Sequence, residues 1–189
     1  MLEVIGKALN PLRAGKDELI LSAAKFTSVP ATIQLTSPAF TEGGRIPALY
    51  TVEAGDISPP LEWSNIPAGT QELVLVIEDY DVPFPHPLMH LLLYSIAPST
   101  TGLAENALPN RENDAQKPGL LLGRNSMHHQ RYDGPAPIPG HGPHHYVFEL
   151  FALAESILFD EVPNRNAFLD AIKDKTVLAT GCLTGTYER

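Results

Sequence analysis

The sequence predicts a mainly β protein, namely an antiparallel β-sandwich with a few short helices at its periphery. From about residue 32, short apolar segments alternate with connections rich in Pro, Gly, Asn and Asp, which is the pattern of successive short strands. The segments at 73–77 and 91–93 are apolar on consecutive residues, which is typical of strands that are buried on both faces. Long helical patterns are few, so a sandwich is favoured over a fold of alternating strands and helices.

The first part of the chain has a helical pattern instead. Its apolar side chains recur at helical spacing, at Leu2, Ile5, Leu9 and Leu12. Pro11 and Gly15 interrupt this stripe, so we expect one or two short helices packed outside the main body. The chain is therefore divided into a helical extension (residues 1–31) and a sandwich domain (residues 32–189). A helix of this length is marginal in water, so its stripe must dock on the sandwich or on a second chain.

Six segments are predicted to be strands because they are short, apolar and bounded by turn-forming residues. They are 32–36, 46–51, 72–78, 90–96, 145–153 and 176–180. The connections hold the strand breakers, as in GPAPIPGHGP at 134–143. One later helix is predicted around 165–173, with Asn164 or Asn166 as its N-cap.

Composition and charge limit the classes of function. The 189 residues suit one domain, and the formal net charge of −9 argues against a nucleic-acid partner or adsorption to an anionic membrane surface. The single cysteine, Cys182, permits no internal disulfide, and no apolar run reaches the length of a membrane span or resembles a signal peptide. These features predict a soluble, cytoplasmic protein.

Ionisable residues stand at the ends of three predicted core strands. Asp79 and Asp81 follow the strand at 72–78, His90 opens the next strand, and His144 precedes the strand at 145–153. We expect them to wall a pocket in which Asp79 lies beside His90 or His144 and fixes the tautomer of that ring. Such a cluster would suit a small oxyanion or phosphate. The prolines of the 134–143 loop would keep the pocket rim rigid.

Each of these signals has an ordinary structural explanation. Aspartates at strand ends are common in turns, and a single histidine at a strand start is more often structural than functional. The remaining histidines lie among Pro, Gly and polar residues, and we expect them to be exposed and to titrate normally. They are His86, His128, His129 and His141.

Taken together, several motifs resemble the phosphatidylethanolamine-binding protein family, and in particular its bacterial-type, kinase-inhibitor-like branch. The resemblance runs from about Leu35 to Tyr187. It rests on DYDVP at 79–83 and GPHH at 142–145, with SPPLEW ahead of them and YDGP between them. Either of the first two motifs alone would be weak, but both in this order are specific.

The resemblance implies a Greek-key sandwich with a shallow anion pocket at one end, where family members accept phosphate, acetate-like anions or phospholipid head groups. The residues that match the family's ligand-binding positions are Asp79, Asp81, Pro83, His90, Gly134, Pro135, His144 and Tyr146. No cofactor is implied. Three residues depart from the pattern, and they put the head-group preference in doubt: Tyr80 replaces a proline, Leu91 replaces a tryptophan and His145 replaces an arginine.

Two functions from different classes remain open. The favoured one is a binding protein for a small anion or a phospholipid head group, with a protein partner such as a kinase as a further option. The alternative is a cyclase, isomerase or lyase in which Asp79, His90 and His144 move protons. A metal site is disfavoured, because proline and glycine deny helical ligand geometry to HxxHH at 141–145 and HxxxH at 86–90. Bacterial-type relatives are often homodimers, so the resemblance also implies a homodimer.

Overall fold

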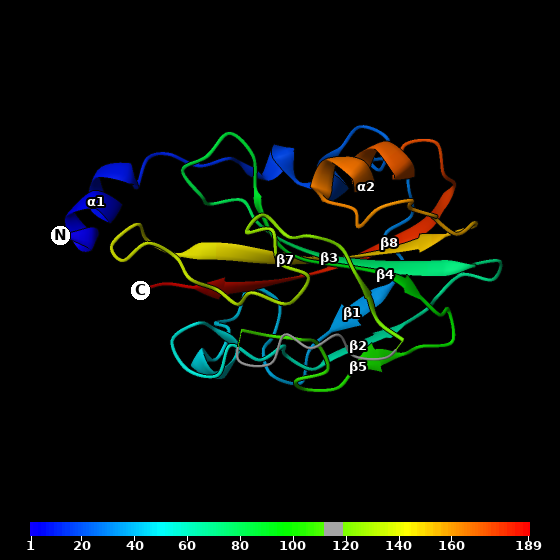
Figure 1. The fold of residues 1–189 in the computed structure, drawn as a ribbon, viewed down its shortest axis with the longest axis horizontal. Helices are drawn as coiled ribbons and strands as arrows, with labels where there is room; N and C mark the ends of the chain where they lie inside the picture. The colour runs from blue at the N-terminus through cyan, green and yellow to red at the C-terminus, as the bar shows by residue number, and fades with distance from the viewer. Residues whose placement is uncertain (112–118) are drawn as a thin grey trace.

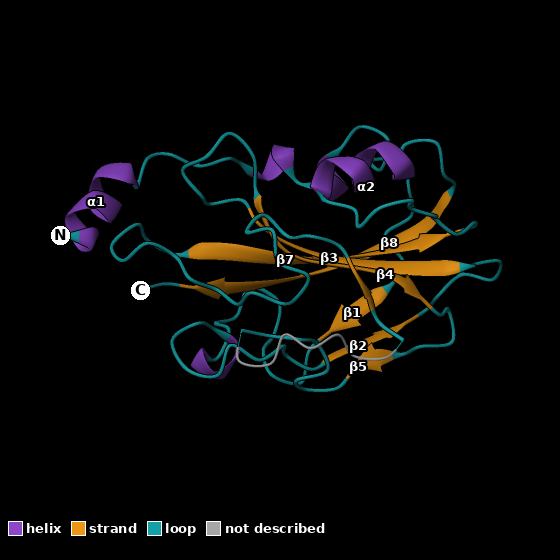
Figure 2. Ribbon diagram, viewed as in Figure 1, coloured by secondary structure: helices purple, strands orange, loops and turns teal. Residues whose placement is uncertain are grey.

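The computed structural model describes residues 1–111 and 119–189, and two antiparallel sheets form its centre (Figure 1). The larger sheet has the strand order β6-β4-β3-β7-β8, and the smaller sheet has the order β1-β2-β5. The strands are β1 (Gln34–Thr36), β2 (Leu61–Ser64), β3 (Glu72–Asp79), β4 (Leu88–Ile96), β5 (Gly102–Leu103), β6 (Leu121–Leu122), β7 (His144–Leu153) and β8 (Val177–Tyr187). Figure 2 shows how little of the described chain is helical, so the predicted mainly β class is confirmed.

The five-stranded sheet separates two apolar layers. β3 is buried along its whole length, and its successive side chains point to opposite faces of the sheet. Leu73 and Leu75 belong to the layer between the two sheets, whereas Val74 and Val76 belong to the layer beneath α2 (Arg165–Ile172). Figure 1 shows α2 and the three-stranded sheet on opposite sides of the larger sheet. The two-sided burial expected from the apolar run is therefore confirmed.

The strand register brings the predicted polar residues to one end of the larger sheet. Asp79, the last residue of β3, pairs with Leu88 at the start of β4 and with Tyr146 near the start of β7. His90 lies two residues along β4 from Leu88, and His144 is the first residue of β7. Because the strands are antiparallel, the end of β3 and the starts of its two neighbours must lie side by side.

The N-terminal segment contacts two parts of the molecule. Ile20 and Phe26 are buried in the apolar layer beneath α2, so this part of the segment is built into the core. α1 (Leu2–Leu9) lies beyond the end of the sheet, beside the loop that contains Pro139 (Figure 1). Much of the apolar stripe of α1 stays uncovered, since Leu2 is 63% exposed and Ile5 is 44% exposed. Within the described ranges, no helix has the length and apolar character needed to cross a membrane.

The predicted strand at 46–51 is wrong. Residues Ala48–Tyr50 form a single 3-10 turn, in which the Tyr50 N–H donates to the Pro47 carbonyl. Pro47 lacks an N–H and cannot complete a strand ladder, and only Arg45 forms an isolated bridge with Thr186. β2, β5 and β6 were not predicted, because strands of two to four residues leave almost no periodicity to read.

The last strand is longer than predicted. β8 continues through Gly181 and Gly185, which read as strand breakers in the sequence. Both positions are closely packed: a Cβ on Gly185 would lie 2.5 Å from Ile46 Cγ1, and one on Gly181 would lie 2.6 Å from the Ile33 carbonyl. The predicted later helix is confirmed as α2, and the Asn164 side chain accepts from the Ala167 N–H as its N-cap.

Candidate functional site

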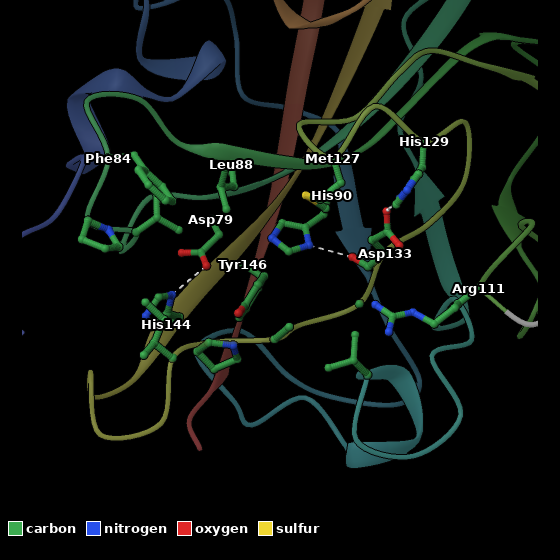
Figure 3. A pocket seen from close by; sticks show the side chains of 17 residues that line it. Asp79, Phe84, Leu88, His90, Arg111, Met127, His129, Asp133, His144 and Tyr146 are labelled. Atoms are coloured by element: carbon green, nitrogen blue, oxygen red, sulfur yellow. Dashed lines mark hydrogen bonds and ion pairs between the residues drawn. The ribbon is translucent and has the colours of Figure 1, made fainter. Parts of the chain in front are cut away.

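A cavity of about 260 Å³ opens where β3, β4 and β7 meet at one end of the larger sheet (Figure 3). Its polar lining comes from two aspartates, three histidines, one arginine and one tyrosine, namely Asp79, His90, Arg111, His129, Asp133, His144 and Tyr146. Its apolar lining includes Phe84, Leu88, Met127 and Ile138. Residues from four separate stretches of the chain therefore contribute to one concave site, as the positions of the motifs predicted.

Asp79 is held by two hydrogen bonds and is nearly inaccessible to solvent. Its Oδ1 accepts from the Asp81 N–H at 2.9 Å, and its Oδ2 lies 2.7 Å from His144 Nδ1. The sequence left open whether Asp79 would lie beside His90 or His144. The structure pairs it with His144, which is also buried.

His144 makes a second hydrogen bond through its other ring nitrogen. Its Nε2 lies 2.7 Å from Nδ1 of His141, and His141 Nε2 lies 2.9 Å from the Leu9 carbonyl oxygen. His141 is completely buried, so the expectation that it is an exposed loop residue is wrong. Burial lowers the pKa of His141, and the Arg13 and His144 side chains lower it further, against the opposing effect of the Leu9 carbonyl.

His90 has one bonded and one unbonded ring nitrogen. Nδ1 lies 2.6 Å from the Asp133 carbonyl oxygen, which only accepts, so Nδ1 carries the hydrogen and donates it. Nε2 is buried and has no hydrogen-bond partner among the described residues. The ring stands edge-on to Tyr146, with 5.2 Å between the ring centroids.

Tyr146 places a second unbonded polar atom in the same cavity. Its hydroxyl is buried and forms no hydrogen bond of good geometry with a described residue, although the Asp79 carboxylate and the Ala136 backbone lie close enough to interact with it. Burial raises the pKa of the phenol well above its ordinary value, and the negative charge of Asp79 raises it further. Tyr146 therefore keeps its proton and is available as a donor.

The wall opposite Asp79 is built around Asp133, whose role was not anticipated. Its carboxylate accepts from His129 and Asn125, each at 2.7 Å, and from Arg131 at 3.0 Å. Burial alone would raise the pKa of Asp133, but these three hydrogen bonds bring it below its ordinary value. His129 is half-buried and lines the cavity, which corrects the expectation that it is a fully exposed loop residue. His86 and His128 are exposed as expected.

Six of the eight positions predicted to bind a ligand line the cavity, and Asp81 and Pro135 do not. Pro83 contributes to the rim, and Gly134 lies where a Cβ would stand 2.5 Å from the Tyr50 carbonyl. Asp81 instead holds the neighbouring loops, through Arg13 Nε at 3.0 Å and His145 Nδ1 at 2.8 Å. Pro135 is buried, and its carbonyl accepts from the Val52 N–H.

The three departures from the family pattern have separate structural settings. Tyr80 and His145 stack on each other, with 5.3 Å between centroids and 7° between planes, so these two changes form one contact. His145 also bonds Asp81, where an arginine would have formed an ion pair. Leu91 is buried in the layer between the sheets and does not line the cavity.

Sequence comparisons agree on one family. The family model described as Phosphatidylethanolamine-binding protein matches residues 36–188. A protein of Aquifex aeolicus named UPF0098 protein is 33% identical over 172 residues, which cover 90% of this chain and 97% of the relative. Another of that name from Methanothermobacter thermautotrophicus is 33% identical over 162 residues, covering 83% of this chain and 99% of the relative.

Solved structures give the same result for the fold. The chain is similar to a Chlamydia trachomatis protein described as a putative phosphatidylethanolamine-binding protein homologue, with a TM-score of 0.73 and 32% identity over 83% of this chain and 97% of that one. It is also similar to E. coli YbcL, described as a member of the mammalian family, with a TM-score of 0.75 and 27% identity over 84% and 99% of the two chains.

Proposed function

The chain belongs to the phosphatidylethanolamine-binding protein family, and on that premise we propose that its pocket binds small phosphate-type oxyanions, including phospholipid head groups. One observation carries the proposal. His90 Nε2 and the Tyr146 hydroxyl are buried without partners among the described residues, and both residues line the same cavity (Figure 3). Buried polar atoms are nearly always bonded, so two unbonded ones on one cavity indicate a ligand that supplies the missing bonds.

The state of the His90 ring sets a requirement on the ligand. Since Nδ1 donates to the Asp133 carbonyl, a neutral His90 offers a lone pair at Nε2. Nε2 can bond an anion in two ways. Either the His90 ring takes up a second proton and donates it, or the ligand carries a proton and donates to the Nε2 lone pair, as hydrogen phosphate can. Tyr146 supplies the other donor. Anion binding at this site is therefore accompanied by a proton.

His144 has a different part in this proposal from the one expected. Both of its ring nitrogens are already bonded, to Asp79 and to His141, so it does not donate to the ligand directly. Its contribution is to hold the Asp79 carboxylate and to offset its charge when the ring is protonated. Asp79 and His144 are thus positioning residues, and His90 and Tyr146 are the ligand contacts.

The dimensions of the cavity favour a small ligand with an apolar neighbour. A volume of about 260 Å³ is at the lower end of ligand pockets, which suits a phosphate ester or a head group and not a complete phospholipid. Phe84 is 53% exposed at the rim, with Leu88 close by in the lining, so a carbon chain leaving the head group would pass over apolar side chains.

Titration calorimetry with phosphate and phosphoethanolamine tests the proposal. Tyr146→Phe removes one hydrogen bond to a charged ligand, worth about 1.5–3 kcal/mol, and should weaken binding about ten- to a hundredfold. His90→Gln should have a comparable effect, whereas His86→Gln, at an exposed position outside the lining, should have none. Absence of binding to wild type at millimolar concentrations of either anion would overturn the proposal.

A proton-transfer enzyme is the second candidate, and the His90 ring favours it. A ring with one nitrogen fixed by a carbonyl and the other unbonded in a cavity is arranged as a general base. In such an enzyme, Asp79→Asn would suppress turnover while leaving the affinity for an inert anion close to normal. In a binding protein, the same change would alter affinity alone.

Three further expectations from the sequence remain predictions. They are a cytoplasmic location, a homodimer, and a protein partner such as a kinase. Light scattering of the full chain at micromolar concentration tests the homodimer. A monomeric mass would contradict it.

A further inference from the structure

Resting on this proposed function, we infer that His141 couples the anion pocket to the N-terminal segment by holding one additional proton in the hydrogen-bonded set formed by Asp79, His144 and His141. We call this set, together with the Leu9 carbonyl that ends it, the histidine relay. It runs from the pocket wall to the last residue of α1 through three contacts of 2.7, 2.7 and 2.9 Å.

Counting protons shows why the relay carries an additional one. The Leu9 carbonyl only accepts, so the third contact needs a hydrogen on His141 Nε2. The first two contacts need one hydrogen each, held on the imidazole nitrogens. Three hydrogens are thus shared among two rings and a carboxylate, whereas two neutral rings supply only two. With every contact bonded, the additional proton is held either on one ring as an imidazolium or on Asp79, and in both cases the set has no net charge.

Arg13 provides the alternative arrangement. Its Nη1 lies 2.7 Å from His141 Nε2, and a guanidinium only donates. When the additional proton leaves, Nε2 can accept from Arg13 instead of donating to Leu9. The relay then keeps two hydrogens and carries the negative charge of Asp79. The two arrangements differ by one proton and by which residue of the N-terminal segment, Leu9 or Arg13, bonds His141 Nε2.

The charge of the relay matters because Asp79 lines the pocket. With the additional proton, the negative charge of the Asp79 carboxylate is offset, and the pocket can bind an anion without repulsion from Asp79. Without it, the carboxylate of Asp79 is not compensated within the relay and repels the anion. Anion affinity should therefore fall as pH rises and the relay loses its proton. Burial, Arg13 and His144 all lower the pKa of His141, so the proton is not held permanently.

The N-terminal segment is docked firmly enough to take part. The Asn10 amide and Arg13 Nη2 both donate to the His141 carbonyl at 2.9 Å. The N–H groups of Ala14 and Gly15 donate to the carbonyls of Val82 and Tyr80, in the segment that follows Asp79. Leu9 ends α1, and the unpaired carbonyls at a helix C-terminus stabilise a nearby imidazolium.

Gly6 shows how closely α1 approaches the loop that carries His141. A Cβ at this position would lie 2.1 Å from the Pro139 carbonyl oxygen and 2.9 Å from the His141 nitrogen. Both are backbone atoms that cannot move aside. Alanine normally stabilises a helix interior relative to glycine, so an unfavourable effect of Gly6→Ala would report the contact and not the helix.

The charged groups around the relay are few and can be assigned. His141 faces Arg13 and His144, and His144 faces Asp79. Tyr146 contributes a protonated phenol next to Asp79. Asp81 contacts Arg13 and His145. The Arg13 guanidinium that faces His141 therefore also pairs with the Asp81 carboxylate.

Sulfate is the probe for the test, because it remains a dianion across the accessible pH range and any proton taken up belongs to the protein. Calorimetry of the full chain in buffers of different ionisation enthalpy gives both affinity and proton uptake. Wild type should bind sulfate with proton uptake and lose affinity as pH rises. His141→Phe keeps a ring but breaks the relay, and it should bind several-fold more weakly at acid pH, with uptake reduced by up to about one proton.

Two further variants keep the outcome clear if His141→Phe is poorly folded. His141→Gln can accept from His144 and donate to Leu9, so it should retain more affinity than the Phe variant. Gly6→Ala leaves every relay side chain in place and should reduce affinity and proton uptake by displacing α1. Val4→Ala is its control, because Val4 lies on the same helix and is 71% exposed, and it should leave affinity and proton uptake unchanged.

The result that overturns the inference is distinct from the one that overturns the proposed function. If wild type binds neither sulfate nor phosphate, the anion pocket itself is wrong. If wild type binds sulfate, but His141→Phe and Gly6→Ala match it in affinity, pH profile and proton uptake, the pocket stands and the coupling through His141 is wrong.

Discussion

The two faces of the five-stranded sheet both bury ionisable groups, but they bond them differently. On the pocket side, Asp79, His144 and His141 form a relay, and two polar atoms of His90 and Tyr146 face a cavity without partners. On the side of α2, Glu78 and Glu149 are fully buried against residues 20–21 and Arg165. Glu78 and Asp79 are consecutive in β3, so the alternation of a strand is enough to send them to opposite faces.

The carboxylates beneath α2 are bonded by the protein itself, apart from Glu149 Oε1, which has no partner among the described residues and does not line the cavity. Glu78 accepts from the Ile20 N–H at 2.8 Å and from Arg165 Nε at 2.6 Å, and Glu149 accepts from the Leu21 N–H at 3.1 Å. Burial raises the pKa of both glutamic acids, and the Glu78 charge adds to the effect at Glu149. The comparison teaches that buried charge alone does not identify a ligand site. What distinguishes the pocket is unbonded polar atoms on an open cavity.

The largest effect expected on the α2 side is that of Arg165→Met. This change leaves the Glu78 carboxylate buried without its cation and should lower the free energy of unfolding by about 3–5 kcal/mol at neutral pH. The loss should be smaller at acid pH, where Glu78 takes up a proton. Urea denaturation measures it. Lys173→Met, which breaks the exposed ion pair with Asp170, is the control and should cost less than about 1 kcal/mol. Equal losses in the two variants would contradict the distinction between the faces.

Glu149→Gln should change how stability depends on pH. The folded-state pKa of Glu149 lies well above its ordinary value of 4.5, so the folded protein binds more protons than the unfolded chain above that pH. Stability contributed by the protonated group is therefore lost as pH rises, by about 1.4 kcal/mol per pH unit until the folded pKa is passed. The Gln variant should lack this slope.

Denaturation at a series of pH values compares the two proteins. Glu161→Gln, at an exposed position, should keep the wild-type slope. A Glu149→Gln curve parallel to that of wild type would show that Glu149 is ionised in the folded protein.

The sequence predicted the sheet better than it predicted the loops around the pocket. β3, β4 and β7 were located because their apolar runs are long enough to be distinguished from the turns between them. His141 was misassigned because its neighbours are Gly and Pro, which indicate an exposed loop. It is buried and contacts Arg13, which lies 128 positions away in the chain, and contacts of that separation leave no local pattern.

The candidate site was predictable where a motif marked it and not elsewhere. Asp79, His90 and Tyr146 were found because they adjoin the ends of core strands, and the register then brings them together. Asp133 acts through two of its own groups. Its backbone carbonyl orients His90, and its side-chain carboxylate orients His129. Neither follows from residue type or spacing, since both depend on how a loop folds back over β4.

The smallest effect expected separates the two faces most directly. Tyr146→Phe removes a buried hydroxyl that has no partner among the described residues, so in a buffer without oxyanions it should raise the free energy of unfolding by about 1 kcal/mol. Sulfate offsets this advantage, because a ligand stabilises wild type, which binds it more tightly, by more than it stabilises the variant. At a sulfate concentration about 100-fold above the wild-type Kd, wild type gains about 2.7 kcal/mol, and a variant that binds tenfold more weakly gains about 1.4 kcal/mol. Urea denaturation with and without sulfate should therefore show the variant ahead in the first buffer and level with wild type in the second. A clear loss of stability without sulfate would mean that the hydroxyl is bonded within the protein, and the pocket would then resemble the face beneath α2.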